Sequence, residues 1–278
     1  MSGTTSDQGG ARVDRAVERI RAEGRVGLMT HIVLGYPTLE ASREIALAMI
    51  RSGVDLLEIQ LPFSDPTADG PTITLACHKA LERGIRVADG MRLMAELCRK
   101  HPTAILFMSY FNLLFNYRGR DGQRRGVEAF VEDAAAAGAA GLIVPDIPPE
   151  EDQEGYPAAC RARGIHPVHV ISPNSDDGRL ETIRRVCSGL LYSTSRTGTT
   201  GKDVAIEFGS LGGFLDRARK VCALPLAVGF SISRREQVEA LRGHAEIAVV
   251  GSHLIRVYEK HGLSALEREV RNLMGSKA

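Results

Sequence analysis

The sequence lacks three features that define whole classes of protein: an excess of charge of one sign, a long apolar run and a paired set of cysteines. Lysine and arginine number 35 against 34 aspartate and glutamate residues, and like charges form no block. This balance excludes the extended electrostatic field of a protein that binds nucleic acid or an anionic membrane. No apolar run reaches the roughly 18 residues that a membrane span requires. The polar first dozen residues contain no apolar signal-peptide core, so we expect a cytoplasmic chain.

The five cysteines are an odd number, are scattered along the chain and include no C-x-x-C pair. This arrangement disfavours both a disulfide framework and a zinc site. We therefore expect buried free thiols, and we assign neither a metal nor a cofactor to the chain. The cysteines are Cys77, Cys98, Cys160, Cys187 and Cys222.

Eight apolar runs rich in Val, Ile and Leu alternate with longer amphipathic stretches. The runs predict strands at 26–34, 55–61, 103–109, 141–145, 166–171, 189–195, 225–230 and 246–250. The stretches predict helices at 39–52, 71–83, 89–100, 127–137, 150–163, 177–187, 209–221, 234–242 and 264–274. An extra N-terminal helix precedes the first strand, because apolar residues recur at helical spacing over residues 13–20.

Strands that are apolar throughout, each followed by a helix, indicate a parallel sheet buried on both faces. At 278 residues this pattern predicts an α/β protein made of a single (β/α)8 TIM barrel, which typically has ~250 residues. The alternative, a doubly wound open sheet, usually carries a G-x-G-x-x-G turn after its first strand. Here that turn reads Gly35-Tyr36-Pro37-Thr38. We therefore expect a disordered tail at residues 1–10 and one catalytic barrel domain at residues 11–278.

Active sites of TIM barrels lie at the C-terminal ends of the strands, and Glu58 lies inside the second apolar strand. A carboxylate there is costly unless it is paired or functional, which makes it a candidate general acid/base. The alternative is a carboxylate that backbone donors satisfy at the strand end. Asp65 and Asp69 follow in a loop rich in Pro and Gly, where a turn or helix-capping role is the commoner explanation for either residue alone.

Glycine-rich loops follow the predicted sixth, seventh and eighth strands, at residues 196–201, 229–233 and 251–253. In TIM barrels, loops at these places bind phosphate through backbone N–H groups, and hydroxyl side chains add further donors. The three loops together predict a phosphorylated small substrate.

Three more side chains are candidates for the mouth of the barrel. Tyr110 and Tyr192 lie at or within strands, where a tyrosine either binds the substrate or packs with its hydroxyl satisfied. His31, in the first strand, is either a proton shuttle or a core histidine bonded to a neighbour. It has no second ligand at metal-binding spacing.

These residues lie in segments that closely resemble the α subunit family of tryptophan synthase. The signature is EIQLPFSDPTADGPTI at residues 58–73, and the similarity continues at residues 109–112, 141–148, 195–201, 228–230 and 250–252. The family is a (β/α)8 barrel that cleaves indole-3-glycerol phosphate to indole and glyceraldehyde 3-phosphate. It normally docks on a pyridoxal-phosphate β subunit that receives the indole. The resemblance therefore implies a carbon–carbon lyase of tryptophan biosynthesis that uses retro-aldol chemistry.

The resemblance also implies roles for individual residues. Glu58 matches the general acid/base, Asp69 matches the carboxylate that holds the indole N–H, and Tyr192 matches an active-site tyrosine. The positions expected to bind the rest of the substrate are His31, Gln60, Tyr110, Thr200 and Phe230. The positions expected to bind phosphate are Gly201, Ser231, Gly251 and Ser252.

Two departures from the family pattern keep alternatives open. His31 replaces the usual Phe, and Gln60 replaces the usual Gly. One alternative is a diverged phosphate-binding barrel lyase that acts on a different, more polar substrate. The other is a non-catalytic partner of a β subunit, against which the retained Glu58 and Asp69 count, because a scaffold needs no costly strand carboxylate. The sequence also leaves open whether a β subunit is bound or the chain is a free-standing indole producer.

Overall fold

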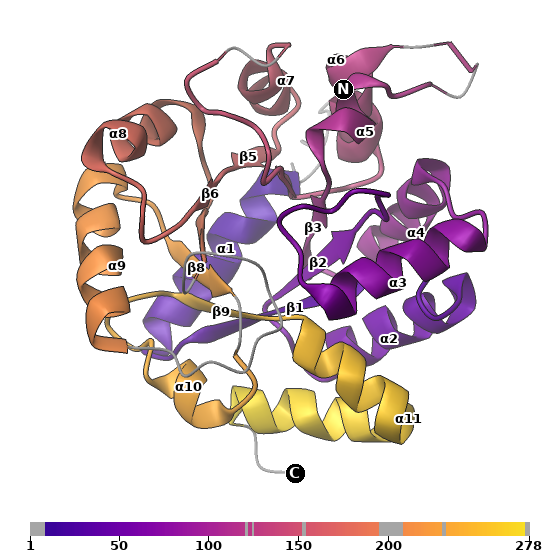
Figure 1. Cartoon of the computed structure of the whole chain (residues 1–278). Helices are drawn as coiled ribbons and strands as arrows, with labels where there is room; N and C mark the ends of the chain where they lie inside the picture. Colours follow the sequence, from indigo (N-terminus) through magenta and orange to yellow (C-terminus); the bar gives the residue numbers. More distant parts are fainter. Residues whose placement is uncertain are drawn as a thin grey trace, which may run out of the picture.

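The computed structural model describes residues 9–119, 122–123, 125–151, 154–194, 208–229 and 232–275, and these form a parallel barrel surrounded by helices (Figure 1). All strand pairs are parallel, in the order β5-β4-β3-β2-β1-β9-β8-β7-β6. The strands are β1 (Gly27–Val33), β2 (Leu56–Gln60), β3 (Ala104–Met108), β4 (Gly141–Ile143), β5 (His166–Val168), β6 (Val170–Ile171), β7 (Leu191–Thr194), β8 (Leu226–Gly229) and β9 (Ile247–Val250). The predicted TIM barrel is therefore confirmed.

The predicted fifth strand, at residues 166–171, is divided into two. β5 pairs with β4, and β6 pairs with β7. His169 lies between the two short strands, which are the two ends of the strand order. This one stretch of chain therefore closes the barrel.

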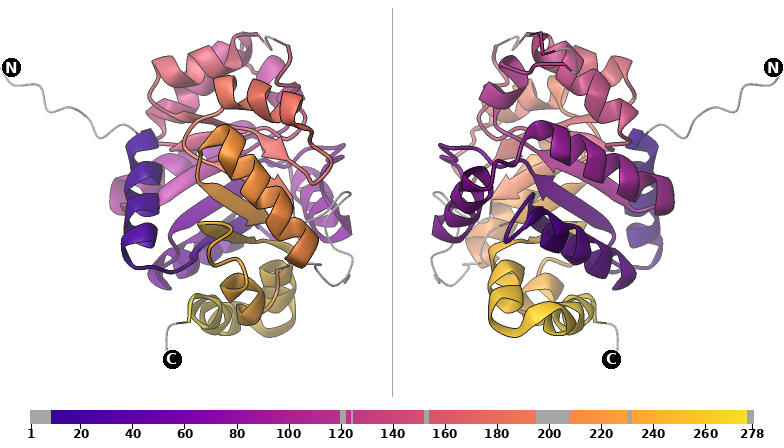
Figure 2. Two further views of the ribbon diagram at one scale, coloured as in Figure 1. Left: turned by 90° about the vertical axis from the view of Figure 1, so that its left-hand side faces the viewer. Right: turned by 90° about the vertical axis from the view of Figure 1, so that its right-hand side faces the viewer.

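The helices cover the outside of the barrel, and Figure 2 shows them from two sides. They are α1 (Gly9–Ala22), α2 (Leu39–Arg51), α3 (Pro71–Glu82), α4 (Val87–Lys100), α5 (Phe111–Phe115), α6 (Gly126–Ala136), α7 (Tyr156–Ala162), α8 (Asp177–Val186), α9 (Phe208–Cys222), α10 (Arg235–Glu239) and α11 (Ser252–Met274). None of the helices in the described part of the chain is long and apolar enough to cross a membrane.

Three helices differ from the sequence-based prediction. α7 begins at Tyr156 rather than near residue 150, because Gly155 has a left-handed backbone (φ 68°) that no helix continues through. α5 was not predicted. α11 begins at Ser252, twelve residues before the predicted start at residue 264, and bends at Gly262, where φ is 74°. The first part of α11, which the prediction missed, therefore begins within the predicted phosphate loop at residues 251–253.

The N-terminal helix α1 closes one end of the barrel. Its buried residues Val13, Val17 and Ile20 pack with the inward-facing strand residues Met29 and Leu56 in one apolar cluster. Figure 2 shows α1, in indigo, at that end of the barrel. Of the expected disordered tail, residues 1–8 lie outside the described residues, and residues 9 and 10 belong to α1. Because α1 closes the N-terminal end, the strand C-termini remain as the place for a site.

Carboxylates at the closed end are paired with arginines. Asp55 accepts hydrogen bonds from Arg25, at 2.7 Å to each oxygen, and from Arg19 at 2.9 Å. Glu246 is bonded in the same way to Arg219 at 2.7 Å. Burial acts to raise the pKa of Asp55, but the hydrogen bonds and charges of the arginines hold it below its usual value. These buried carboxylates are therefore structural.

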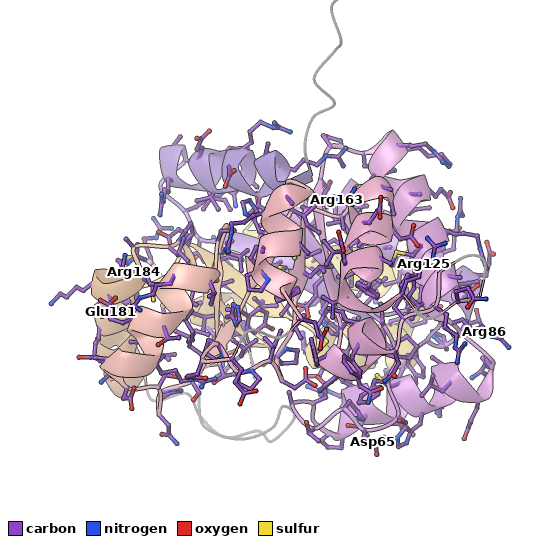
Figure 3. The ribbon with its side chains drawn as sticks, turned by 90° about the horizontal axis from the view of Figure 1, so that it is seen from above. Asp65, Arg86, Arg125, Arg163, Glu181 and Arg184 are labelled. Carbon is purple, nitrogen blue, oxygen red and sulfur yellow. The ribbon has the colours of Figure 1, made fainter. Side chains whose placement is uncertain are left out.

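The cysteines and the charged side chains lie where a barrel fold would place them. All five cysteines are buried and free, as expected. Charged side chains lie on the outer faces of the helices, and Figure 3 shows one such pair, Glu181 and Arg184 on α8, at the periphery of the molecule. The outer surface is charged, as is usual for helices around a barrel. We therefore expect the active site at the C-terminal ends of the strands.

Candidate active site

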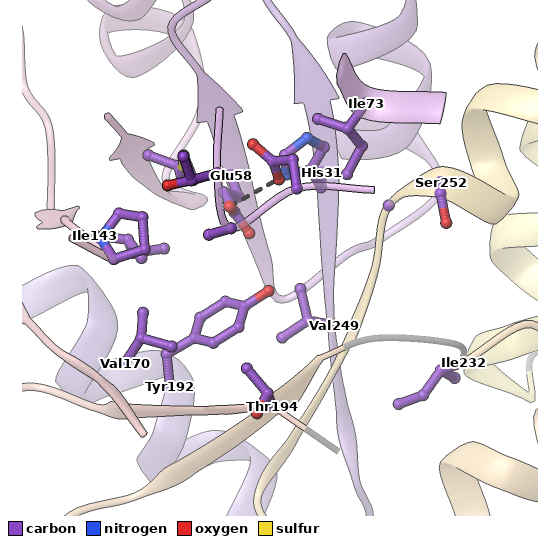
Figure 4. A pocket seen from close by; sticks show the side chains of 16 residues that line it. His31, Glu58, Ile73, Ile143, Val170, Tyr192, Thr194, Ile232, Val249 and Ser252 are labelled. Atoms are coloured by element: carbon purple, nitrogen blue, oxygen red, sulfur yellow. Dashed lines mark ion pairs between the residues drawn. The ribbon is translucent and has the colours of Figure 1, made fainter. Parts of the chain in front are cut away.

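A cavity of about 320 Å³ lies at the C-terminal ends of the strands (Figure 4). Residues of seven strands and of the loops that follow them form its wall. They are His31, Glu58, Thr67, Ala68, Asp69, Ile73, Met108, Ile143, Pro145, Val170, Tyr192, Thr194, Ile232, Val249, Gly251 and Ser252. The cavity therefore collects candidate residues that are separated by up to about 220 positions in the sequence.

Glu58 and His31 are neighbours across β1 and β2, where the strand register pairs them directly. The imidazole Nδ1 of His31 lies 3.1 Å from Oε1 of Glu58, and the two side chains are 6% and 3% exposed. His31 Nε2 and Glu58 Oε2 are buried and have no hydrogen-bond partner in the described part of the chain. Buried polar atoms of this kind are normally satisfied, so both atoms are suited to a bound ligand.

The contact with Glu58 also affects the pKa of His31. Burial by itself lowers the pKa of His31, but the charge of Glu58, the hydrogen bond to it and the charge of Asp69 together raise that pKa above the ordinary histidine value. His31 is thus bonded to a neighbour, as one reading of the sequence has it, and it also lines the cavity. The contact agrees with the reading of a histidine bonded to a neighbour, whereas the proton-shuttle reading stays a prediction.

Two hydrogen-bond donors that do not line the cavity hold Asp69 in place. Gln60 Nε2 donates to Asp69 Oδ2 at 2.6 Å, and the Tyr110 hydroxyl donates to the same oxygen at 2.9 Å. Tyr110 also accepts a hydrogen bond from the Ala68 N–H at 3.0 Å, which fixes the loop. The other oxygen, Oδ1, accepts no hydrogen bond from any described residue, so it is the one that can receive a ligand N–H.

Gln60 and Tyr110 do not line the cavity, although the sequence prediction placed both against the substrate. Gln60 is fully buried and Tyr110 is 1% exposed. Their contact with the cavity passes through Asp69. The prediction missed this because β2 and the loop after it fold back on each other, and no periodicity in the sequence encodes that contact.

Burial raises the pKa of Asp69 above its usual value, and the charge of Glu58 acts in the same direction. The charge of His31 and the hydrogen bonds from Gln60 and Tyr110 oppose this increase. No arginine or lysine of the described residues pairs with Glu58 or Asp69, in contrast with the closed end of the barrel. A buried carboxylate whose pKa is raised, such as Asp69, is typical of a functional site.

Tyr192 projects from β7 across the cavity, and Figure 4 shows its hydroxyl directed toward Glu58. Burial raises the pKa of Tyr192 well above that of a free tyrosine, and the charges of Glu58 and Asp69 raise it further. The tyrosine is therefore neutral and able to donate. Gly229 makes room for it, because a Cβ at that position would lie 2.6 Å from the hydroxyl oxygen.

Most of the remaining wall is apolar. Its apolar side chains come from β3, β4, β6, β9 and α3 and from the segment before α10, and all were absent from the sequence prediction. They are Ile73, Met108, Ile143, Val170, Ile232 and Val249. In the sequence these residues are indistinguishable from core residues, because they are ordinary apolar residues that carry no chemical signal. An apolar wall with a few polar groups at one side is suited to a flat aromatic ring.

The expected phosphate positions are only partly within the described residues. Gly251 and Ser252 line the cavity at the N-terminus of α11, where unpaired amides and the helix dipole favour an anion. The other expected phosphate and substrate positions, Gly201, Ser231, Thr200 and Phe230, lie outside the described residues.

Gly251 also lies directly against His31. A Cβ on Gly251 would come within 3.2 Å of the Cβ and Cγ atoms of His31. We therefore expect Gly251→Val to raise the KM for a phosphorylated substrate about tenfold, since a branched side chain displaces His31 and obstructs the amides, and tenfold is about 1.4 kcal/mol. Gly251→Ala should have a smaller effect of the same sign. Equal affinity of wild type and Gly251→Val for inorganic phosphate would show that this turn does not bind it.

Comparison with known proteins agrees with this geometry. The family model described as "Tryptophan synthase alpha chain" matches residues 17–276. The tryptophan synthase alpha chain of Syntrophotalea carbinolica is 42% identical over 252 residues, which cover 91% of this chain and 96% of that protein. That of Desulfotalea psychrophila is 41% identical over 246 residues, 88% of this chain and 93% of that protein. A solved structure of Mycobacterium tuberculosis tryptophan synthase has a TM-score of 0.86 and 30% identity, with 95% of this chain and 97% of that chain covered. The chain therefore belongs to the tryptophan synthase alpha chain family.

Proposed function

We propose that the chain is a lyase that cleaves indole-3-glycerol phosphate to indole and glyceraldehyde 3-phosphate by retro-aldol chemistry. Membership of the family and the arrangement of the cavity support the proposal. The observation that carries it is the pair of differently held carboxylates, Glu58 and Asp69, which face one largely apolar cavity. Two carboxylates in different environments can divide the work of an acid and of an electrostatic stabiliser.

The reaction needs an electron sink, because the bond to be broken joins indole C3 to the hydroxyl-bearing carbon of the glycerol chain. Glu58, as a carboxylate, takes the proton of that hydroxyl and delivers it to C3, which makes the ring a cation whose nitrogen carries the positive charge. Asp69 Oδ1 stabilises that charge by accepting the indole N–H. The alkoxide left on the glycerol chain then becomes the aldehyde as the carbon–carbon bond breaks, and the electron pair of that bond restores the aromatic ring. The products are indole and an aldehyde, with no net change in protons.

The other groups bind and orient the substrate. The apolar wall holds the indole ring, while Gly251 and Ser252 at the start of α11 bind the phosphate. Tyr192, directed toward Glu58, positions that carboxylate. Thr200, Gly201, Phe230 and Ser231 are assigned to the same substrate by the family pattern alone.

The two alternatives have less support. A more polar substrate is favoured by the unpartnered atoms of His31 and Glu58, but the six apolar wall residues favour an aromatic ring. A non-catalytic role does not explain why two carboxylates remain at the cavity without arginine partners, since incompletely paired buried charge destabilises a fold.

The family membership supports a pyridoxal-phosphate tryptophan synthase β subunit as the partner that receives the indole. We propose a cytoplasmic location, where the other soluble reactions of amino-acid biosynthesis take place.

The test is to incubate the purified chain with indole-3-glycerol phosphate, with and without a β subunit. We expect indole and glyceraldehyde 3-phosphate in equal amounts, measured by chromatography and by a dehydrogenase-coupled assay. Inorganic phosphate should compete with the substrate. Binding of the substrate without release of indole under both conditions would contradict the proposal.

A further inference from the structure

The cavity contains two carboxylates that repel each other. Glu58 is 2% exposed and Asp69 is partly buried. The negative charge of Glu58 makes ionisation of Asp69 less favourable. Two such groups in a low-dielectric cavity need a positive charge nearby, and without one, one of the two carboxylates becomes protonated.

His31 is a titratable base in the wall of the same cavity as both carboxylates. Its Nδ1 contacts Glu58 Oε1 at 3.1 Å, and its charge also acts on Asp69. The register of β1 and β2 places His31 beside Glu58, and the backbone of Gly251 lies close to His31, since a Cβ on Gly251 would come within 3.2 Å of the His31 Cβ and Cγ atoms.

We propose that His31, as an imidazolium, is the positioning residue of this site, which neutralises the Glu58 and Asp69 pair and so keeps Asp69 ionised for the indole nitrogen. This inference rests on the proposed function, since it concerns the same reaction. The proposed role explains why a histidine is present in a wall that is largely apolar. The ring acts through the carboxylates and does not have to react with the substrate itself.

The other titratable groups around His31 do not supply this charge. On the cavity side these are Glu58, Asp69 and Tyr192. Behind the ring, a small hollow between β1 and α11 contains Tyr36 and Tyr258. A phenol carries no positive charge in either protonation state. The increase in the pKa of His31 caused by Glu58 and Asp69 agrees with an imidazolium near neutral pH.

Loss of the imidazolium should shift the titration of Asp69. Without that positive charge, burial and Glu58 raise the pKa of Asp69 further, by about one unit on the scale of a nearby opposite charge. As the pH falls, Asp69 then becomes protonated earlier. The acidic limb of the kcat/KM profile should therefore move to higher pH by about one unit.

The experiment compares wild type with His31→Gln, which keeps a hydrogen-bond donor for Glu58 but carries no charge. His244→Gln is the matched control, because His244 forms a histidine–carboxylate pair with Asp216 at 3.1 Å on the outside of the barrel. The readout is NMR titration of 13C-labelled aspartate carboxyl and histidine ring signals in the ligand-free protein. Activity profiles against pH follow for the same three proteins.

We expect the Asp69 signal to titrate about one pH unit higher in His31→Gln and to be unchanged in His244→Gln. An Asp69 titration that does not change in His31→Gln would overturn the inference, even if the enzyme is active. Absence of indole release by wild type would instead overturn the proposed function, while the NMR titration would still decide the role of His31. A His31→Gln variant that is less stable but titrates like wild type would show a purely structural role.

Discussion

Glu58→Gln should lower the kcat of indole release at least 10²-fold, the usual loss when a general acid/base is removed. Glutamine has the same shape as glutamate and can still accept a hydrogen bond from His31, so the wall of the cavity is preserved. It cannot donate a proton to C3 or accept one from the hydroxyl. We therefore expect the KM for indole-3-glycerol phosphate to change little, as steady-state kinetics of the purified variant will show.

The matched control is Glu181→Gln, on the outer face of α8, where the glutamate pairs with the exposed Arg184. Its activity should equal that of wild type. Thermal unfolding and circular dichroism check that both variants are folded. If Glu58→Gln releases indole at the wild-type rate, Glu58 is a structural carboxylate and the proposed mechanism is wrong.

Much of this architecture could be predicted from local patterns in the sequence. Apolar strands and amphipathic helices are local signals, so the barrel and the N-terminal helix were both predicted. Glu58 could be found because a carboxylate in an apolar strand has a high cost, and Gly251 could be found because a glycine after a strand permits close approach. Each of these signals depends on residues that are close in the sequence, and none depends on how distant segments are packed together.

Contacts between distant segments could not be predicted in the same way. The pairing of His31 with Glu58 depends on the register of β1 and β2, which the two strands acquire only in the barrel. The hydrogen bond from Gln60 to Asp69 depends on the fold of the loop between them. The division of the fifth strand at His169 likewise follows from closure of the barrel, because β5 and β6 have to pair with different neighbours.

Asp69→Asn should reduce kcat/KM by about 10²- to 10³-fold, the range found when a group that stabilises a developing charge is removed. Asparagine can still accept the hydrogen bonds of Gln60 and Tyr110 through its oxygen, which then turns its NH2 group toward the ligand. A donor would face the indole N–H, and the positive charge of the ring would lack a counterion. Both KM and kcat should change, whereas Glu58→Gln affects chiefly kcat.

The pH dependence separates the loss of charge from a general disturbance of the site. Since the pKa of Asp69 lies above its usual value, wild-type kcat/KM should fall as the pH decreases through that raised pKa. In Asp69→Asn this acidic limb should disappear, because the residual activity no longer depends on a carboxylate at this position. Asp65→Asn is the matched control, since Asp65 is exposed in the same loop and does not line the cavity, and its profile should match wild type. An acidic limb that persists unchanged in Asp69→Asn would assign the limb to another group and remove Asp69 from the charge-stabilising role.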